Sequence, residues 1–189
     1  MKNNRVLVIG SGGREHAFVW AFNKDQNIEK IFCAPGNAGT SSICENVEID
    51  IFNHMEIIGF VKENNITLTV VGPEIPLADG IVDSFSKYNL PIFGPDKFAS
   101  QLESSKIFAR DIMYENKIPQ PKYFACSSVG EAEKIKNKIG LPLVLKVDGL
   151  AAGKGVIICH NEKEFNNGII EIFKKNTFGQ AGSKISIEE

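Results

Sequence analysis

The fold is decided by the stretch Val6-Leu7-Val8-Ile9-Gly10-Ser11-Gly12-Gly13-Arg14-Glu15-His16. Its first four residues form a short apolar run that stops at glycine, which is typical of a strand buried on both faces of a parallel sheet. A helix is predicted from about residue 14 to residue 23, so the glycines lie in a strand-to-helix turn. Such a turn favours an α/β fold with a doubly wound parallel sheet.

The same alternation continues through the first hundred residues. The predicted strands lie at 31–33, 46–51, 67–71 and 91–93, and the predicted helices at 54–64 and 77–88. Because helices separate consecutive strands, we expect an open parallel sheet with helices on both faces. We assign residues 1–100 to this Rossmann-like N-terminal domain, which would bind substrate.

The pattern changes near residue 100. Residues from about 97 to 117 are predicted to be helical, in one or two segments, and Pro119 and Pro121 then end any helix. We interpret 101–120 as a helical linker. Residues 121–189 follow the order strand, helix (129–139), strand (143–147), glycine-rich loop, strand (156–159), helix (162–174) and strand (185–187). This order predicts a partial α+β domain.

Composition and charge indicate an ordinary globular chain. It has 189 residues, of which 43% are hydrophobic and 23% are charged, and its formal net charge is −2. The sequence has no excess of basic residues, so a nucleic-acid partner is not expected. No apolar run approaches the roughly 20 residues of a membrane helix. The cysteines and histidines are scattered, so neither a zinc site nor a disulfide framework is expected. We therefore expect a cytoplasmic protein.

The glycine turn is the first candidate site. Gly12 and Gly13 let the backbone approach an anion, and the N–H groups that open the next helix point toward it. A nicotinamide dinucleotide site is one alternative, although Glu15 stands where the GxGxxG fingerprint needs glycine and the second strand ends without an acidic residue. A purely structural turn is another.

Two further loops follow strands at the same expected edge of the sheet. Ala34-Pro35-Gly36-Asn37-Ala38-Gly39-Thr40 follows the second strand, and Gly72-Pro73-Glu74 follows the clearest strand. Open α/β sheets bind ligands at that edge, so these loops are candidate walls of one pocket. Glu74 has an equally good alternative role, as a carboxylate that faces the dipole of the next helix.

The most informative motif joins two strands in the second half. Leu143-Val144-Leu145-Lys146-Val147-Asp148 precedes the loop Gly149-Leu150-Ala151-Ala152-Gly153-Lys154-Gly155. It is not a Walker A loop, because its spacing is one residue short, glycine follows the lysine, and a strand follows the loop. Lysine inside an apolar strand is costly unless paired. We interpret Lys146 and the loop as a phosphate site, with a flexible hairpin as the alternative.

Taken together, these motifs resemble the phosphoribosylamine–glycine ligase family of ATP-grasp enzymes. The segments that carry the resemblance are GSGGREHA, APGNAGT, VGPEIPL, FGP, LESSK, KIP, LVLKVDGLAAGKGV and IEE, in the family's order and approximate spacing between positions 9 and 189. The resemblance implies ATP-dependent ligation of glycine to 5-phosphoribosylamine through a glycyl phosphate. The products would be glycinamide ribonucleotide, ADP and phosphate, in purine biosynthesis.

The resemblance also implies a role for particular residues. Lys106 and Lys146 would contact ATP phosphates beneath the glycine-rich loop, and Glu188 and Glu189 would begin the hinge that receives adenine and ribose. The implied ATP-binding residues are Lys106, Lys146, Gly149, Ala152, Gly153, Lys154, Gly155, Glu188 and Glu189. The implied phosphoribosylamine-binding residues are Gly12, Gly13, Arg14, Gly36, Asn37 and Glu74. Periodicity alone equally allows Lys106 to be a solvated helix lysine.

No protein nucleophile is expected, because phosphoryl transfer needs positioning and charge neutralisation. The resemblance implies Mg²⁺ or Mn²⁺, with ligands beyond residue 189, since no cluster here has enough carboxylates for a metal site. We expect the 189-residue piece not to be a competent ligase alone. The expected partners are phosphoribosylamine, glycine and ATP. Two alternatives stay open, namely a related ATP-grasp formyltransferase or carboxylase, and a nucleotide-binding regulatory module without chemistry.

Overall fold

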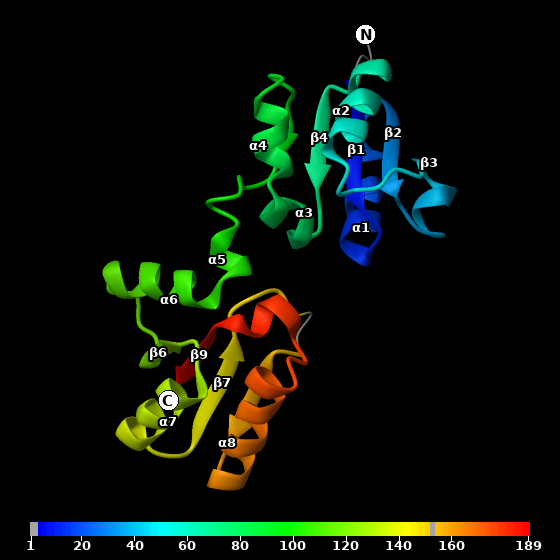
Figure 1. Ribbon diagram of the computed structural model, residues 1–189. Helices are drawn as coiled ribbons and strands as arrows, with labels where there is room; N and C mark the ends of the chain where they lie inside the picture. The colour runs from blue at the N-terminus through cyan, green and yellow to red at the C-terminus, as the bar shows by residue number, and fades with distance from the viewer. Residues whose placement is uncertain (1–3, 152–153) are drawn as a thin grey trace. The chain divides into compact units, whose positions relative to one another are not determined.

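The apolar run after Asn4 forms the central strand of a five-stranded parallel sheet in the computed structural model, which describes residues 4–151 and 154–189. The strand order is β3-β2-β1-β4-β5 (Figure 1). The strands are β1 (Asn4–Gly10), β2 (Ile28–Pro35), β3 (Glu45–Asn46), β4 (Leu68–Val71) and β5 (Ile92–Phe93). Residues 6–9 are all buried. The sheet belongs to the first of two compact units, Met1–Ser100 and Gln101–Glu189.

Helices cover both faces of this sheet. Along β1, Val6 and Val8 pack with Val19 of α1, whereas Leu7 and Ile9 pack with the other helices, because successive side chains of a strand point to opposite faces. The predicted doubly wound arrangement is therefore confirmed. The helices are α1 (Gly13–Phe22), η1 (Thr40–Ser42, a 3₁₀ turn), α2 (His54–Glu63), α3 (Glu74–Asp79) and α4 (Ile81–Ser86).

The strand predicted at 46–51 is wrong beyond its first residue. The Val47 N–H still donates to the carbonyl of Cys33, but the Ile49 N–H then turns back to the carbonyl of Val47 and the ladder stops. Val47, Ile49 and Ile51 nevertheless pack against the core. Their alternation in the sequence records this burial and not a hydrogen-bonded strand.

The helix predicted at 77–88 is two shorter helices. Gly80 ends α3 and begins α4 with φ at +100°, a left-handed conformation that residues with a Cβ rarely adopt. The helical region also starts earlier than expected, at Glu74, directly after Pro73. Glu74 consequently lies in the first turn of α3, where a carboxylate interacts favourably with the helix dipole.

The second unit contains an antiparallel sheet with the strand order β6-β9-β7-β8. Residues 101–120 lie within this unit. Its strands are β6 (Tyr123–Cys126), β7 (Leu143–Val147), β8 (Val156–Cys159) and β9 (Ile185–Glu188). Its helices are α5 (Gln101–Ser104), α6 (Lys106–Glu115), α7 (Val129–Ile139), α8 (Glu162–Ile169), the π-helical turn η2 (Ile170–Lys174) and the 3₁₀ helix η3 (Gly179–Ser183). No helix among the described residues combines the length and the apolar character needed to cross a membrane.

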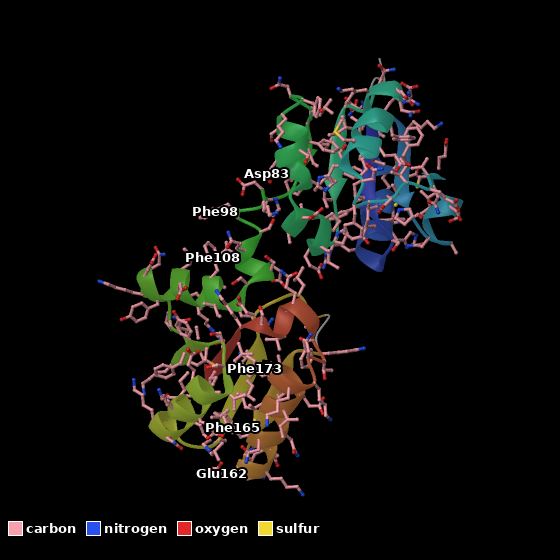
Figure 2. All side chains as sticks on the ribbon, in the orientation of Figure 1. Asp83, Phe98, Phe108, Glu162, Phe165 and Phe173 are labelled. Carbon is pink, nitrogen blue, oxygen red and sulfur yellow. The ribbon has the colours of Figure 1, made fainter. Side chains whose placement is uncertain are left out.

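Alternation along β7 separates a face of the sheet that is buried in the core from a second face, which carries Val144 and Lys146. Leu143, Leu145 and Val147 are buried in a core that includes Phe165 of α8. Figure 2 labels Phe165. Lys146 lies between them in the chain, so its side chain points to the opposite face. There it meets Glu188 of β9, which in turn contacts Arg110 of α6. The fold therefore places α6 over the face of the sheet that carries Lys146 and Glu188.

Gly80→Ala is expected to destabilise the first unit by at least about 1 kcal/mol, because alanine is disfavoured in the left-handed conformation. Gly59→Ala is the matched control, since Gly59 lies inside α2 and a Cβ there would meet nothing within 4 Å. That substitution should stabilise the unit by up to about 1 kcal/mol. Urea unfolding measures both changes, and equal effects would contradict the helix break at Gly80.

Candidate functional sites

A cavity of about 410 Å³ opens at the carboxyl ends of β1 and β4, and its lining includes Gly12, Gly13, Arg14 and Glu74. The structure thus brings together four of the six residues predicted to bind phosphoribosylamine. The Arg14 guanidinium donates to the carbonyl of Gly72 at 2.5 Å and lies 3.9 Å from the Glu74 carboxylate. Both side chains are well exposed, at 61% and 45%, so a ligand in the cavity can reach them.

The Glu15 carboxylate lies beneath the glycine turn and is buried. It accepts a hydrogen bond from the Gly12 N–H at 2.5 Å and so caps the start of α1. Its carboxyl group also fills the space where a Cβ on Gly10 or on Gly72 would stand. Glycine is therefore required at both positions by a neighbouring side chain. The sequence showed only that Glu15 breaks the dinucleotide fingerprint, although its place three residues after Gly12 is that of a capping carboxylate.

Asn37 joins two of the predicted loops. Its amide nitrogen donates to the carbonyls of Ser11 and Gly12, at 2.9 and 3.3 Å, and its amide oxygen accepts from the N–H groups of Gly39 and Thr40, at 2.7 and 3.0 Å. Every polar atom of this side chain is thus bonded within the protein. Asn37 holds the loop that follows β2 against the glycine turn.

Gly36 lies in the same loop and has φ at +73°. A Cβ there would collide with the side chain of Asn46, which itself bonds to Thr40 and to the carbonyl of Asn37. Neither Gly36 nor Asn37 is among the residues that line the cavity. Their contacts hold the loop in its conformation without contributing to the cavity lining.

In the second unit, the carboxylate of Glu188 is the centre of a cluster of charges. It is 2% exposed, and it accepts two hydrogen bonds from Arg110, at 3.0 and 2.7 Å, and one from Lys146 at 2.6 Å. The Ser186 hydroxyl donates to it as well, at 3.3 Å. Burial opposes ionisation of this carboxyl, but the bonds from Arg110 and Lys146 outweigh it, so the pKa of Glu188 lies below its usual value.

A cavity of about 300 Å³ lies beside this cluster. Its charged lining residues are Lys106, Arg110 and Lys146, against the carboxylates of Glu103 and Glu188. Three cations against two anions leave a positive excess, which suits a phosphate group. Apolar side chains, among them Leu102, Met113 and Val156, complete the wall.

Lys106 and the start of the glycine-rich loop are in direct contact. The Lys106 Nζ donates to the carbonyl of Gly149 at 3.3 Å. Asp148, the residue before the loop, accepts from the backbone N–H of Ile107 and from the hydroxyl of Ser105. At the far end of the loop, a Cβ on Gly155 would collide with Val147. These contacts pack both ends of the loop closely against their surroundings.

The remaining predicted ATP-binding residues fall into three groups. Lys154 is exposed. Glu189 points away from the cluster and pairs at the surface with Lys122, at 2.9 Å. Ala152 and Gly153 lie outside the described residues.

Sequence reasoning missed Arg110 and the role of Asp148. One signal was present for Arg110, because Lys106, Arg110 and Met113 recur at helical spacing and so share one face of α6.

The described residues fit a nucleotide but supply no metal site. Within 4–151 and 154–189, no group of three or more His, Cys, Asp or Glu side chains could hold a metal ion. Glu188, the most buried carboxylate of the cavity, is already bonded to two cations. The location of the ligands for Mg²⁺ or Mn²⁺ beyond residue 189 stays a prediction.

Comparison with known proteins gives one consistent result. Residues 4–103 match the family described as "Phosphoribosylglycinamide synthetase, N domain", and residues 104–189 match its "ATP-grasp (A) domain". A phosphoribosylamine–glycine ligase of Vibrio parahaemolyticus is 47% identical over 187 residues, which are 98% of this chain and 44% of that protein. The chain thus spans less than half the length of this curated relative.

Solved structures agree with the fold. The crystal structure of the phosphoribosylamine–glycine ligase of Thermotoga maritima superposes with a TM-score of 0.76 at 30% identity, over 98% of this chain and 43% of that one. The N5-carboxyaminoimidazole ribonucleotide synthetase of the same organism has a TM-score of 0.72 at 18% identity, over 99% of this chain and 46% of that one. This second likeness concerns the fold alone.

Glu188→Gln is expected to destabilise the second unit by about 3 kcal/mol at pH 7, because it leaves two partly buried cations without their anion. The pKa of Glu188 is lowered in the folded state, so its contribution is present above the unfolded pKa of about 4.3 and is lost as the pH falls through the folded pKa. The difference between the wild type and the variant should therefore shrink below about pH 4.

Unfolding free energies measured from pH 7 to pH 3 test this dependence. Glu189→Gln is the control, since its exposed pair with Lys122 should contribute less than about 1 kcal/mol. A difference for Glu188→Gln that stays constant across the whole range would contradict the charged cluster.

Asn37→Ala is expected to cost about 2 kcal/mol and to speed amide exchange at Gly39 and Thr40, whose N–H groups lose their acceptor. Asn27→Ala is the control, because that exposed amide bonds only to the Asp25 side chain among the contacts described. Exchange measured by NMR would decide the matter. Unchanged protection at both amides would show that Asn37 does not hold the loop.

Proposed function

Because this chain belongs to the phosphoribosylglycinamide synthetase family, we propose that it forms the phosphoribosylamine-binding unit and the first ATP-grasp lobe of an enzyme that joins glycine to 5-phosphoribosylamine. The products are glycinamide ribonucleotide, ADP and phosphate, and the step belongs to purine synthesis in the cytoplasm. The chain spans 44% of its curated relative, so the complete reaction is part of the proposal.

The observation that carries the proposal is the charge cluster around Glu188 in the second unit. Lys146 and Arg110 share one carboxylate, and Lys106 adds a third cation to the same cavity. These cations, together with the loop from Gly149 to Gly155, would hold the phosphates of ATP. Transfer of the γ-phosphoryl group to glycine needs this positioning and neutralisation more than a protein nucleophile.

The transfer would give glycyl phosphate and ADP. The amine of phosphoribosylamine would then attack the carbonyl carbon and release phosphate, which leaves the new amide bond. Mg²⁺ or Mn²⁺, when bound, would supply further neutralisation of the phosphate charge. We place phosphoribosylamine in the cavity of the first unit, where Arg14 offers a cation for its phosphate and Glu74 an acceptor for its hydroxyls or amine.

Lys146→Ala is expected to weaken ATP binding by about 10- to 100-fold, as loss of one charge-assisted contact would. The fold should survive, because Glu188 keeps both of its bonds to Arg110. Titration calorimetry with ATP measures the change in a protein that contains this chain and the further length of its relatives. Lys122→Ala is the matched control, since this lysine pairs with Glu189 outside the cavity. Equal ATP affinities for wild type and Lys146→Ala would remove the basis for the ATP site.

The reaction itself is tested in a protein that contains this chain and the further length of its relatives. Release of ADP from ATP should require both glycine and phosphoribosylamine. Release that depends on bicarbonate or formate in place of glycine would assign the chain to a different ATP-grasp reaction.

A further inference from the structure

Asp148 lies between β7 and the glycine-rich loop, with its carboxylate at the N-terminus of α6. Its Oδ1 accepts from the backbone N–H of Ile107 at 2.7 Å and from the Ser105 hydroxyl at 3.0 Å, and its Oδ2 is 3.2 Å from the same hydroxyl. Ser105 is the N-cap of α6, and its hydroxyl accepts from the N–H of Phe108 at 3.1 Å. Two of the first N–H groups of the helix are therefore satisfied by Asp148 and Ser105.

The carboxylate of Asp148 thus already occupies the N-terminus of α6. A helix N-terminus attracts negative charge, and here the protein's own carboxylate meets that attraction. A phosphate beside α6 would consequently be held by side chains and the loop, and not by the end of the helix. Of the three cations that line the cavity, Lys106 is the one at this end of the helix, as the first residue of α6.

The same carboxylate sits at the base of the loop. The backbone N–H of Asp148 donates to the carbonyl of Lys184 at 3.0 Å. Gly149, the next residue, lies so close to Ala181 that a Cβ on it would collide. Lys106 donates to the carbonyl of Gly149 at 3.3 Å. Asp148 therefore links the start of α6 with the start of the loop, and Lys106 makes its contact between the two.

We propose that Asp148 is a positioning residue for the nucleotide phosphates, acting through Lys106 and the first residue of the glycine-rich loop. The inference rests on the proposed ATP site and deepens it. Asp148 itself does not touch the phosphates. Its carboxylate fixes the backbone on both sides of the Lys106–Gly149 contact, so that the lysine is directed to one place before the ligand arrives.

A simple helix cap would account for the same hydrogen bonds, and the two roles differ in how they couple to Lys106. If Asp148 only stabilises the helix, its loss and the loss of Lys106 weaken ATP binding independently. If Asp148 acts through Lys106, the second loss adds little once the first has occurred. A double-mutant cycle separates these cases, because it isolates the coupling between two residues.

The experiment uses a protein that contains this chain and the further length of its relatives. Titration calorimetry measures the ATP affinity of the wild type, Asp148→Ala, Lys106→Met and the double variant. We expect each single substitution to weaken binding by about tenfold and the double variant by little more than either. Asp148→Asn keeps an acceptor for the Ile107 N–H and should stay within about threefold of wild type. Ser128→Ala removes the equivalent N-cap of α7, away from the cavity, and should leave the affinity unchanged.

Each outcome bears on the inference. Effects that multiply to about a hundredfold in the double variant would reduce Asp148 to a cap and overturn it, as would wild-type affinity for Asp148→Ala. Should Asp148→Ala not fold, Ser105→Ala takes its place in the cycle, because Ser105 supplies one of the two groups that hold the carboxylate. If the protein that contains this chain and the further length of its relatives binds no ATP, the proposed function itself is refuted, before any variant is compared.

Discussion

The buried carboxylate of Glu188 constrains how the second unit folds. An unpaired charge at 2% exposure would be very costly, so the fold holds only if cations reach it. Lys146 comes from the neighbouring strand and Arg110 from α6. Because Arg110 belongs to α6, its two hydrogen bonds to Glu188 fix that helix over the face of the sheet that carries Glu188. The same requirement explains the lysine that interrupts the apolar strand at 143–147.

In the first unit, by contrast, side chains bond to the backbone of the loops. Glu15 accepts from the Gly12 N–H, and Asn37 bridges the glycine turn and the loop after β2. The side chains of these two residues use their hydrogen bonds to hold the loops in place. Arg14 and Glu74 are different, because both stay well exposed beside the cavity. Glu15 and Asn37 therefore hold the loops, whereas the exposed side chains of Arg14 and Glu74 are available to a ligand.

Local patterns predicted the strands and most helices, because burial of an apolar run leaves a direct trace in the sequence. They missed the helix break at Gly80, which depends on the backbone conformation of that glycine. They also predicted a strand at Ile49, where the side chain is partly buried but the backbone does not pair with a neighbouring strand. The site was harder to predict. Arg110 lies 78 residues from Glu188, and Asp148 lies 43 from Ser105. No local period connects such pairs, and only the resemblance to a family brought the right segments together.

The two final glutamates show what geometry adds to a motif. Strand alternation turns Glu188 inward and leaves Glu189 at the surface with Lys122, although the resemblance treated them alike. The inward carboxylate is bonded to Arg110 through two N–H groups and to Lys146 through one. A phosphate that draws Lys146 away therefore leaves Glu188 still paired. With Arg110 as a second cation, Lys146 can serve a ligand without exposing a buried charge to its full desolvation cost.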